Sequence, residues 1–251
     1  MFNSIKKAVT ISIAICFLSG LANAQEKNVT KGNQQWVQYY NQTKFSKKWS
    51  LLVDGGYRWK QDLGKRSQYI IRAAGAYMIS PGIRVAAGFA HLGTYTDIDI
   101  TVVEFRTHQE LTVKQVIGEL GLNHRVRIEQ RFIEATKNND EQFNRSNWRF
   151  RYSIVFSIPI IKQFPNHDDM SLKLNVGDEI FINAGKDIVY NVFDQNRILI
   201  GPAFQLNKKL TFTLTYSGKF GALNLPSQYT YSHILWMGIR HKIDLTKVSN
   251  K

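Results

Sequence analysis

The sequence has almost no cysteine and no long apolar stretch beyond its first residues. Cys16 is the only cysteine and lies inside the N-terminal apolar run, so disulfide bonds contribute nothing to the rest of the chain. Beyond that run, no stretch offers the ~18 consecutive apolar residues of a transmembrane helix. If the protein spans a membrane, it must do so as a closed barrel, because only helices and closed barrels satisfy their backbone hydrogen bonds in lipid.

The chain also lacks the short motifs of common hydrolases and metal sites. Neither GxSxG nor HExxH occurs. No spacing of His, Asp and Glu repeats, so we expect no metal site and no cofactor. The histidines of the predicted strands are scattered, and we expect no enzymatic activity from them: His108, His124, His233 and His241.

The N-terminus is typical of a secretory signal peptide. Lys6 and Lys7 precede an apolar run, and Ala22-Asn23-Ala24 supplies the small residues that a signal peptidase recognises. The run is too short for a membrane-spanning helix. We therefore predict a signal peptide over residues 1–24 and a single domain over residues 25–251.

The chain is strongly basic, with a formal net charge of +14. Because an exported protein rarely meets nucleic acid, we expect no nucleic-acid partner. Outer-membrane lipid or lipopolysaccharide is the more natural anionic partner. The alternative is that many arginines are paired inside the fold and the remaining excess is solvated lysine.

From Gln34 onward, apolar and polar residues alternate in short segments separated by turn residues. Between Trp49 and Trp59, for example, the odd positions are mainly large and apolar while the even positions include Asp54 and Arg58. This period of two indicates β-strands. About eleven such segments occur, with no helical pattern and no domain boundary, so the sequence predicts one all-β domain.

The segment Glu119–Phe132, ELGLNHRVRIEQRF, shows the alternation most clearly. One face of the strand is mostly apolar, whereas the other carries Arg125, Arg127, Glu129 and Arg131. Such an ionic face is too polar for a dry core. A membrane barrel accommodates it, because apolar side chains face lipid and polar ones face the lumen. We therefore predict a single antiparallel up-and-down transmembrane β-barrel with a lumen lined by Arg and Glu.

Finer features follow from the same pattern. Bacterial single-chain barrels have an even number of strands, so we expect ten or twelve strands rather than eleven. We expect a loop over Gly93–Thr101, a turn near Lys114-Gln115, and Asp178 near a rim because it interrupts an apolar face. The aromatic residues fit interface girdles or, alternatively, the packed core of a soluble barrel: Trp36, Trp49, Trp59, Trp148, Tyr152 and Trp236.

The candidate site is the set of charged side chains on the predicted inner face. Rings of charge select ions, and arginine binds carboxylate or phosphate in a bidentate manner. The alternative is a network of Arg–Glu pairs that only braces the barrel. The set consists of Glu104, Arg106, Glu110, Arg125, Arg127, Glu129, Arg131, Arg149, Arg151, Glu179 and Arg197.

Several of these motifs together resemble a known family. They are Tyr57-Arg58-Trp59, the run His124–Arg131, Trp148-Arg149-Phe150-Arg151-Tyr152, Glu179, and Asn196-Arg197 followed by Gly201. This arrangement is similar to the domain of unknown function 2490 family of Gram-negative bacteria, over essentially the whole chain after the signal peptide. The resemblance implies an outer-membrane β-barrel-like protein and implies no substrate or catalytic residue.

Three classes of function remain open from the sequence. The first is an outer-membrane barrel that acts as a narrow channel or binding barrel for small anionic solutes. The second is a structural or partner-binding barrel with a closed ionic lumen. The third comprises a secreted, soluble, lipocalin-like barrel and an outer-membrane lipid-modifying enzyme.

Overall fold

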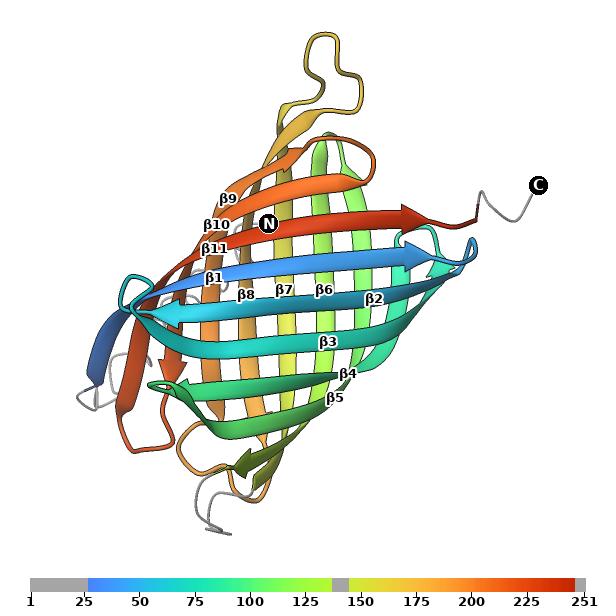
Figure 1. Ribbon diagram of the computed structural model, residues 1–251. Helices are drawn as coiled ribbons and strands as arrows, with labels where there is room; N and C mark the ends of the chain where they lie inside the picture. The colour runs from blue at the N-terminus through green and yellow to red at the C-terminus, as the bar shows by residue number, and fades with distance from the viewer. Residues whose placement is uncertain (1–26, 137–144, 247–251) are drawn as a thin grey trace, which may run out of the picture.

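The computed structural model describes residues 27–136 and 145–246, and the predicted signal peptide lies outside these ranges. The described chain forms one closed β-barrel (Figure 1). In these ranges no helix is long and apolar enough to cross a membrane, a finding that does not bear on crossing by strands. The strands are β1 (Asn28–Lys44), β2 (Trp49–Lys60), β3 (Lys65–Ser80), β4 (Ile83–Thr96), β5 (Asp99–Ile117), β6 (Leu120–Ala135), β7 (Arg145–Ile161), β8 (Ser171–Ala184), β9 (Phe193–Gln205), β10 (Leu210–Ala222) and β11 (Gln228–Asp244).

The barrel closes through a parallel pair between its first and last strands. Every sequential pair is antiparallel, whereas β1 and β11 run in the same direction from Asn28↔Gln228 to Lys44↔Asp244 (Figure 1). The expectation of ten or twelve strands is therefore wrong. That expectation assumed that the first strand begins and the last strand ends at the same end of the barrel. An odd count instead puts them at opposite ends, which we call the N-terminal end, where β1 begins, and the C-terminal end, where β11 ends.

The strands are strongly staggered around the barrel. A path that starts at Lys44 on β1 and steps from each residue to its cross-strand partner passes once around the barrel. It returns to β1 at Thr30, 14 residues before its starting point. A stagger of this size tilts the strands against the barrel axis and widens the lumen. Side chains from many strands can therefore meet inside.

The side chains are distributed inside out relative to a soluble protein. Large apolar residues in the middle of strands lie on the outer surface, such as Ile198, which is 57% exposed. Glu129, on the inner face, is only 2% exposed. The alternation predicted from the sequence is thus confirmed, with the charged face of Glu119–Phe132 pointing inward.

The inner wall is not wholly ionic. Ile70, Ala90 and Leu92 form a small apolar cluster on β3 and β4. Trp36 and Trp236 also point inward, and their rings contact edge to face at a centroid distance of 5.2 Å. These two tryptophans therefore do not belong to an outer girdle, unlike Trp49 and Trp148, which are exposed on the outer surface.

Three expectations about strand ends are wrong because the strands run further than the sequence pattern indicated. The predicted loop Gly93–Thr101 is only the two residues between β4 and β5. The turn near Lys114-Gln115 lies at residues 118–119, since β5 continues to Ile117. Asp178 lies in the middle of β8 and not near a rim. Its carboxylate accepts hydrogen bonds at 2.9 Å from the Asn196 side chain on β9. This partner explains how a carboxylate is accommodated on that face.

Close packing at one inward glycine generates a stability prediction. A β-carbon at Gly201 would overlap the backbone carbonyl oxygen of Leu214 on β10, whereas one at Gly75 would meet nothing within 4 Å. Gly201→Ala should therefore destabilise the barrel by about 1–3 kcal/mol, because the backbone of β10 must shift. Gly75→Ala, the matched control, should be neutral or slightly stabilising. Denaturant midpoints of both variants in detergent test this, and equal midpoints would contradict it.

Candidate functional site

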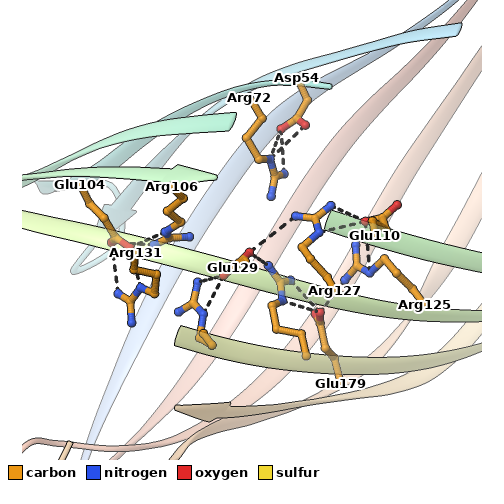
Figure 2. A network of polar contacts seen from close by, with 12 residues as sticks. Asp54, Arg72, Glu104, Arg106, Glu110, Arg125, Arg127, Glu129, Arg131 and Glu179 are labelled. Carbon is orange, nitrogen blue, oxygen red and sulfur yellow. Dashed lines mark hydrogen bonds and ion pairs between the residues drawn. The ribbon is translucent and has the colours of Figure 1, made fainter. Parts of the chain in front are cut away.

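The charged residues predicted from the sequence converge inside one half of the barrel. All but Arg197 lie on β5, β6, β7 and β8, where their side chains form two neighbouring groups of ion pairs that we together call the network (Figure 2). One group is Glu104 with Arg106 and Arg131, and the other is Glu110, Glu129 and Glu179 with the remaining four arginines. Strand register accounts for only part of this pairing, because it sets Glu110 opposite Arg127 and Glu129 opposite Arg149 but also sets like charges opposite each other. It places Arg106 opposite Arg131 and Arg127 opposite Arg151, and like charges directly opposite each other are destabilising.

Carboxylates placed diagonally to these arginine pairs offset the repulsion. Glu104 lies between Arg106 and Arg131, accepting hydrogen bonds from Arg106 Nη2 at 2.7 Å and from Arg131 Nε at 2.5 Å. Both guanidinium groups approach it with two nitrogens. Bidentate pairing of this kind is among the stronger charge-assisted interactions in proteins.

Glu129 is the centre of the network. It accepts hydrogen bonds from Arg149 Nη2 at 2.5 Å and Arg151 Nη1 at 2.6 Å, and Arg127 Nη1 lies 3.7 Å away. Arg151 also donates to Glu179, which accepts a second hydrogen bond from Arg125 at 2.5 Å. Two carboxylates therefore link arginines from β6 and β7, so that no guanidinium in this part of the network lacks an acid.

Glu110 extends the network toward the C-terminal end of the barrel. It accepts hydrogen bonds from Arg127 Nε at 2.9 Å and from Arg84 Nη2 at 3.3 Å. Arg84 was not among the residues singled out in the sequence. Its segment carries no other charge on the inner face, so the alternation gave no reason to choose it.

A separate ion pair joins β2 and β3. Arg72 contacts the Asp54 carboxylate at 2.7 Å, and Asp54 also accepts a hydrogen bond from Gln38 at 2.6 Å. Figure 2 shows this pair set apart from the network of β5–β8. Both residues were visible in the sequence on the correct face, but nothing in the pattern indicated that they would pair.

Arg197 is the one predicted residue that does not join the network. It is 8% exposed and faces Glu179 across β8 and β9, yet Glu179 is already occupied by Arg125 and Arg151. Its guanidinium carbon lies over two aromatic rings instead, 5.1 Å from the centroid of Trp36 and 4.6 Å from that of Phe181. Its Nε is buried and has no hydrogen-bond partner in the described part of the chain.

The lumen at the C-terminal end of the barrel is lined by cations. The charged groups that most affect Lys114 are all basic and come from β4, β8 and β11. We call this group the basic mouth, which comprises Arg84, Lys114, Lys173, Arg240 and Lys242. Its charges are on the inner faces of strand ends, so they would act on any anion entering there.

Histidines on the outer surface have tyrosine partners. The Nδ1 atom of His124 lies 2.8 Å from the hydroxyl of Tyr152, and His233 and His241 have the same contact with Tyr216 and Tyr39. His108 is buried in the lumen. Across residues 27–136 and 145–246, no group of three or more His, Cys, Asp or Glu side chains is placed to hold a metal ion.

The central position of Glu129 generates a second prediction. Glu129→Gln should destabilise the barrel by about 3–5 kcal/mol, because it leaves buried guanidinium groups underpaired. Glu119→Gln is the control. Glu119 pairs with Lys162 at the surface, where both side chains are more than half exposed, so its loss should cost less than about 1 kcal/mol. Denaturant midpoints in detergent provide the comparison, and equal effects of the two changes would show that the network does not brace the barrel.

Comparison with known proteins identifies the family of the chain. No curated protein and no solved structure matches it. The model of one family, described as a protein of unknown function (DUF2490), matches residues 33–230, which include every residue of the ionic network. The protein therefore belongs to the DUF2490 family.

Proposed function

We propose that the protein is an outer-membrane β-barrel whose lumen takes up small anionic solutes, as a narrow passage or a binding barrel. The observation that carries this proposal is the distribution of charge and apolar surface. Apolar side chains cover the outside of a closed sheet, and inside it arginines and lysines outnumber carboxylates. The expected signal peptide and the family resemblance support an exported location.

The outer surface argues for lipid as its surroundings. A soluble barrel would place its apolar face inward, and contiguous exposed apolar surface is rare on soluble monomers. Here the exposed apolar residues follow one another around the barrel at mid-strand positions, as in Phe89, Phe105, Phe150 and Ile198. This pattern matches the lipid-facing band of transmembrane barrels and disfavours a lipocalin-like pocket.

A second candidate function rests on the depth of the network. Four carboxylates and four of their six arginines are almost completely buried, and breaking such pairs is costly. The lumen would then be closed in its middle, and the protein would serve as a structural or partner-binding barrel. We assign no catalytic step to either candidate.

The membrane location predicts different tolerance of charge at two adjacent positions on β10. Leu214 points outward, with Met237 as its cross-strand partner, and is 46% exposed. Leu214→Arg should destabilise the barrel by about 2–4 kcal/mol if this position meets the bilayer midplane. Thr213→Arg should cost much less, because Thr213 points into the lumen, where its cross-strand partners are Ala203 and Gly238.

The measurement is the denaturant midpoint of each variant inserted in phospholipid vesicles. The unmutated protein should also need detergent for extraction from cells and should migrate differently on a gel before and after heating. Recovery as a soluble periplasmic monomer, or equal tolerance of arginine at the two positions, would contradict a membrane barrel.

If anions pass through the lumen, the preference of the current for anions should depend on the basic mouth. In a planar bilayer with asymmetric salt, the reversal potential of the unmutated protein should indicate anion preference. Lys114→Glu combined with Lys242→Glu should reduce or reverse that preference, because it changes the sign of charge at the C-terminal end. Thr213→Gln, which adds no charge to the lumen, is the control. Absence of any current would exclude the passage and favour the closed barrel.

A further inference from the structure

The charges of the lumen are divided unevenly between its two sides. On β5–β8 each of the six arginines of the network has a carboxylate partner. On the other side, β2, β9 and β10 contribute Arg58, Arg197 and Lys219 to the inner wall, and in the described part of the chain none of these three makes an ion pair with an acid. We call these three residues the unpaired cations.

The three unpaired cations are close to one another. Lys219 is the direct cross-strand partner of Arg197. Arg58 reaches the same place from the other direction, because its guanidinium carbon lies 4.0 Å from the centroid of the Trp36 ring, over which Arg197 also lies. Each cation is within the electrostatic field of the others.

The acids near this group are already paired with other arginines: Glu179, which faces Arg197, holds Arg125 and Arg151. Asp194 is the only acid with a notable effect on Lys219, but its carboxylate pairs with Arg149 at 3.1 Å. Aromatic rings stabilise cations only partly, and buried unpaired charge is strongly unfavourable. The barrel therefore carries a concentrated positive charge that its own carboxylates leave unmatched.

We infer that Arg58, Arg197 and Lys219 form a binding site for a small oxyanion, the chemistry shared by phosphate and carboxylate groups. Guanidinium groups bind such anions through paired N–H donors, and the buried, unpartnered Nε of Arg197 offers one of these. The ammonium group of Lys219 adds a compact point charge. This inference rests on the proposed uptake of anionic solutes and assigns that uptake to specific residues.

The site lies close to the N-terminal end of the barrel. Arg58 is two residues from the last residue of β2, and Lys219 is three residues from the end of β10. Lys60, the last residue of β2, is exposed and belongs to the same inner face. An anion entering at this end would pass Lys60 first and then reach the unpaired cations.

The neighbouring aromatic residues give the site an optical readout. Trp36 lies beneath both Arg58 and Arg197, and it is 2% exposed. An anion that draws the two guanidinium groups together would change the surroundings of this indole. Tryptophan fluorescence can therefore report binding independently of any ion current.

The experiment is a titration of the purified barrel in nonionic detergent with sodium phosphate or sodium succinate, at constant ionic strength set with chloride. We expect saturable changes in fluorescence and a rise in the thermal unfolding midpoint with at least one of the two anions. A response to phosphate alone identifies a phosphate group as the ligand class, and a response to succinate alone identifies a carboxylate.

Lys219→Gln should weaken binding about tenfold or more, because it removes one charge-assisted contact. Without oxyanion it should raise the unfolding midpoint, since it also removes a like charge beside Arg197. Arg197→Gln should weaken binding as well, but Arg197 packs on Trp36 and Phe181, so Lys219→Gln is the decisive variant. Lys114→Gln, a lumenal cation at the opposite end, should leave the affinity unchanged.

Three results would overturn the site. They are the absence of saturable binding, unchanged affinity in Lys219→Gln, and an equal loss of affinity in Lys114→Gln, which would mean general attraction by the lumen.

The titration needs no conduction, so it is separate from the proposed passage. Binding without current would keep the site and exclude the passage, whereas anion-selective current without saturable binding would keep the passage and exclude the site.

Discussion

The pairing of Glu129 with the arginines of β6 and β7 is the interaction on which the interior of this barrel depends. Register sets Arg127 opposite Arg151, and Glu129 holds Arg151 and approaches Arg127 closely enough to offset their repulsion. Without a carboxylate at this position, strands β6 and β7 would bring buried like charges together. The inward arginines are therefore compatible with a closed sheet only because Glu104, Glu110, Glu129 and Glu179 are interleaved with them.

The sequence was most informative about which face each residue occupies. The strict alternation around Arg125, Arg127, Glu129 and Arg131 identified the lumen wall correctly, because a period of two is a local property of the extended chain. Strand ends were less predictable, since β5 continues through Lys114 to Ile117 with no local signal for its end. The parallel closure of β1 on β11 could not be predicted, because it depends on how the whole sheet curves.

The distinction between local features and features that depend on the whole sheet also applies to the candidate site. Ten of the eleven predicted residues form ion pairs with one another because they come from four adjacent strands, where sequence neighbours are also neighbours in space. The contact of Arg197 with Trp36 crosses the closure between β1 and β11, whereas Arg58 lies directly opposite Trp36 on the neighbouring strand β2. Residues from opposite ends of the sequence meet at the closure, so a strand-by-strand interpretation left Arg58 and Lys219 out of the candidate site and left open whether Trp36 lies in an outer girdle or in a packed core.

The two sides of the lumen also differ in how easily an anion could pass along them. An anion passing between the carboxylates and arginines of β5–β8 would have to break buried ion pairs, and each loss would leave a partner uncompensated. On the side of β2, β9 and β10, Arg58, Arg197 and Lys219 make no ion pair with any described acid, so an anion arriving there gains contacts without breaking an ion pair. The network of β5–β8 thus acts as a fixed wall in which four carboxylates hold six arginines, and the cations without an acid partner lie on the side of β2, β9 and β10. A solute path along the barrel would therefore follow β9, β10 and β2, with the basic mouth at one end and Lys60 at the other.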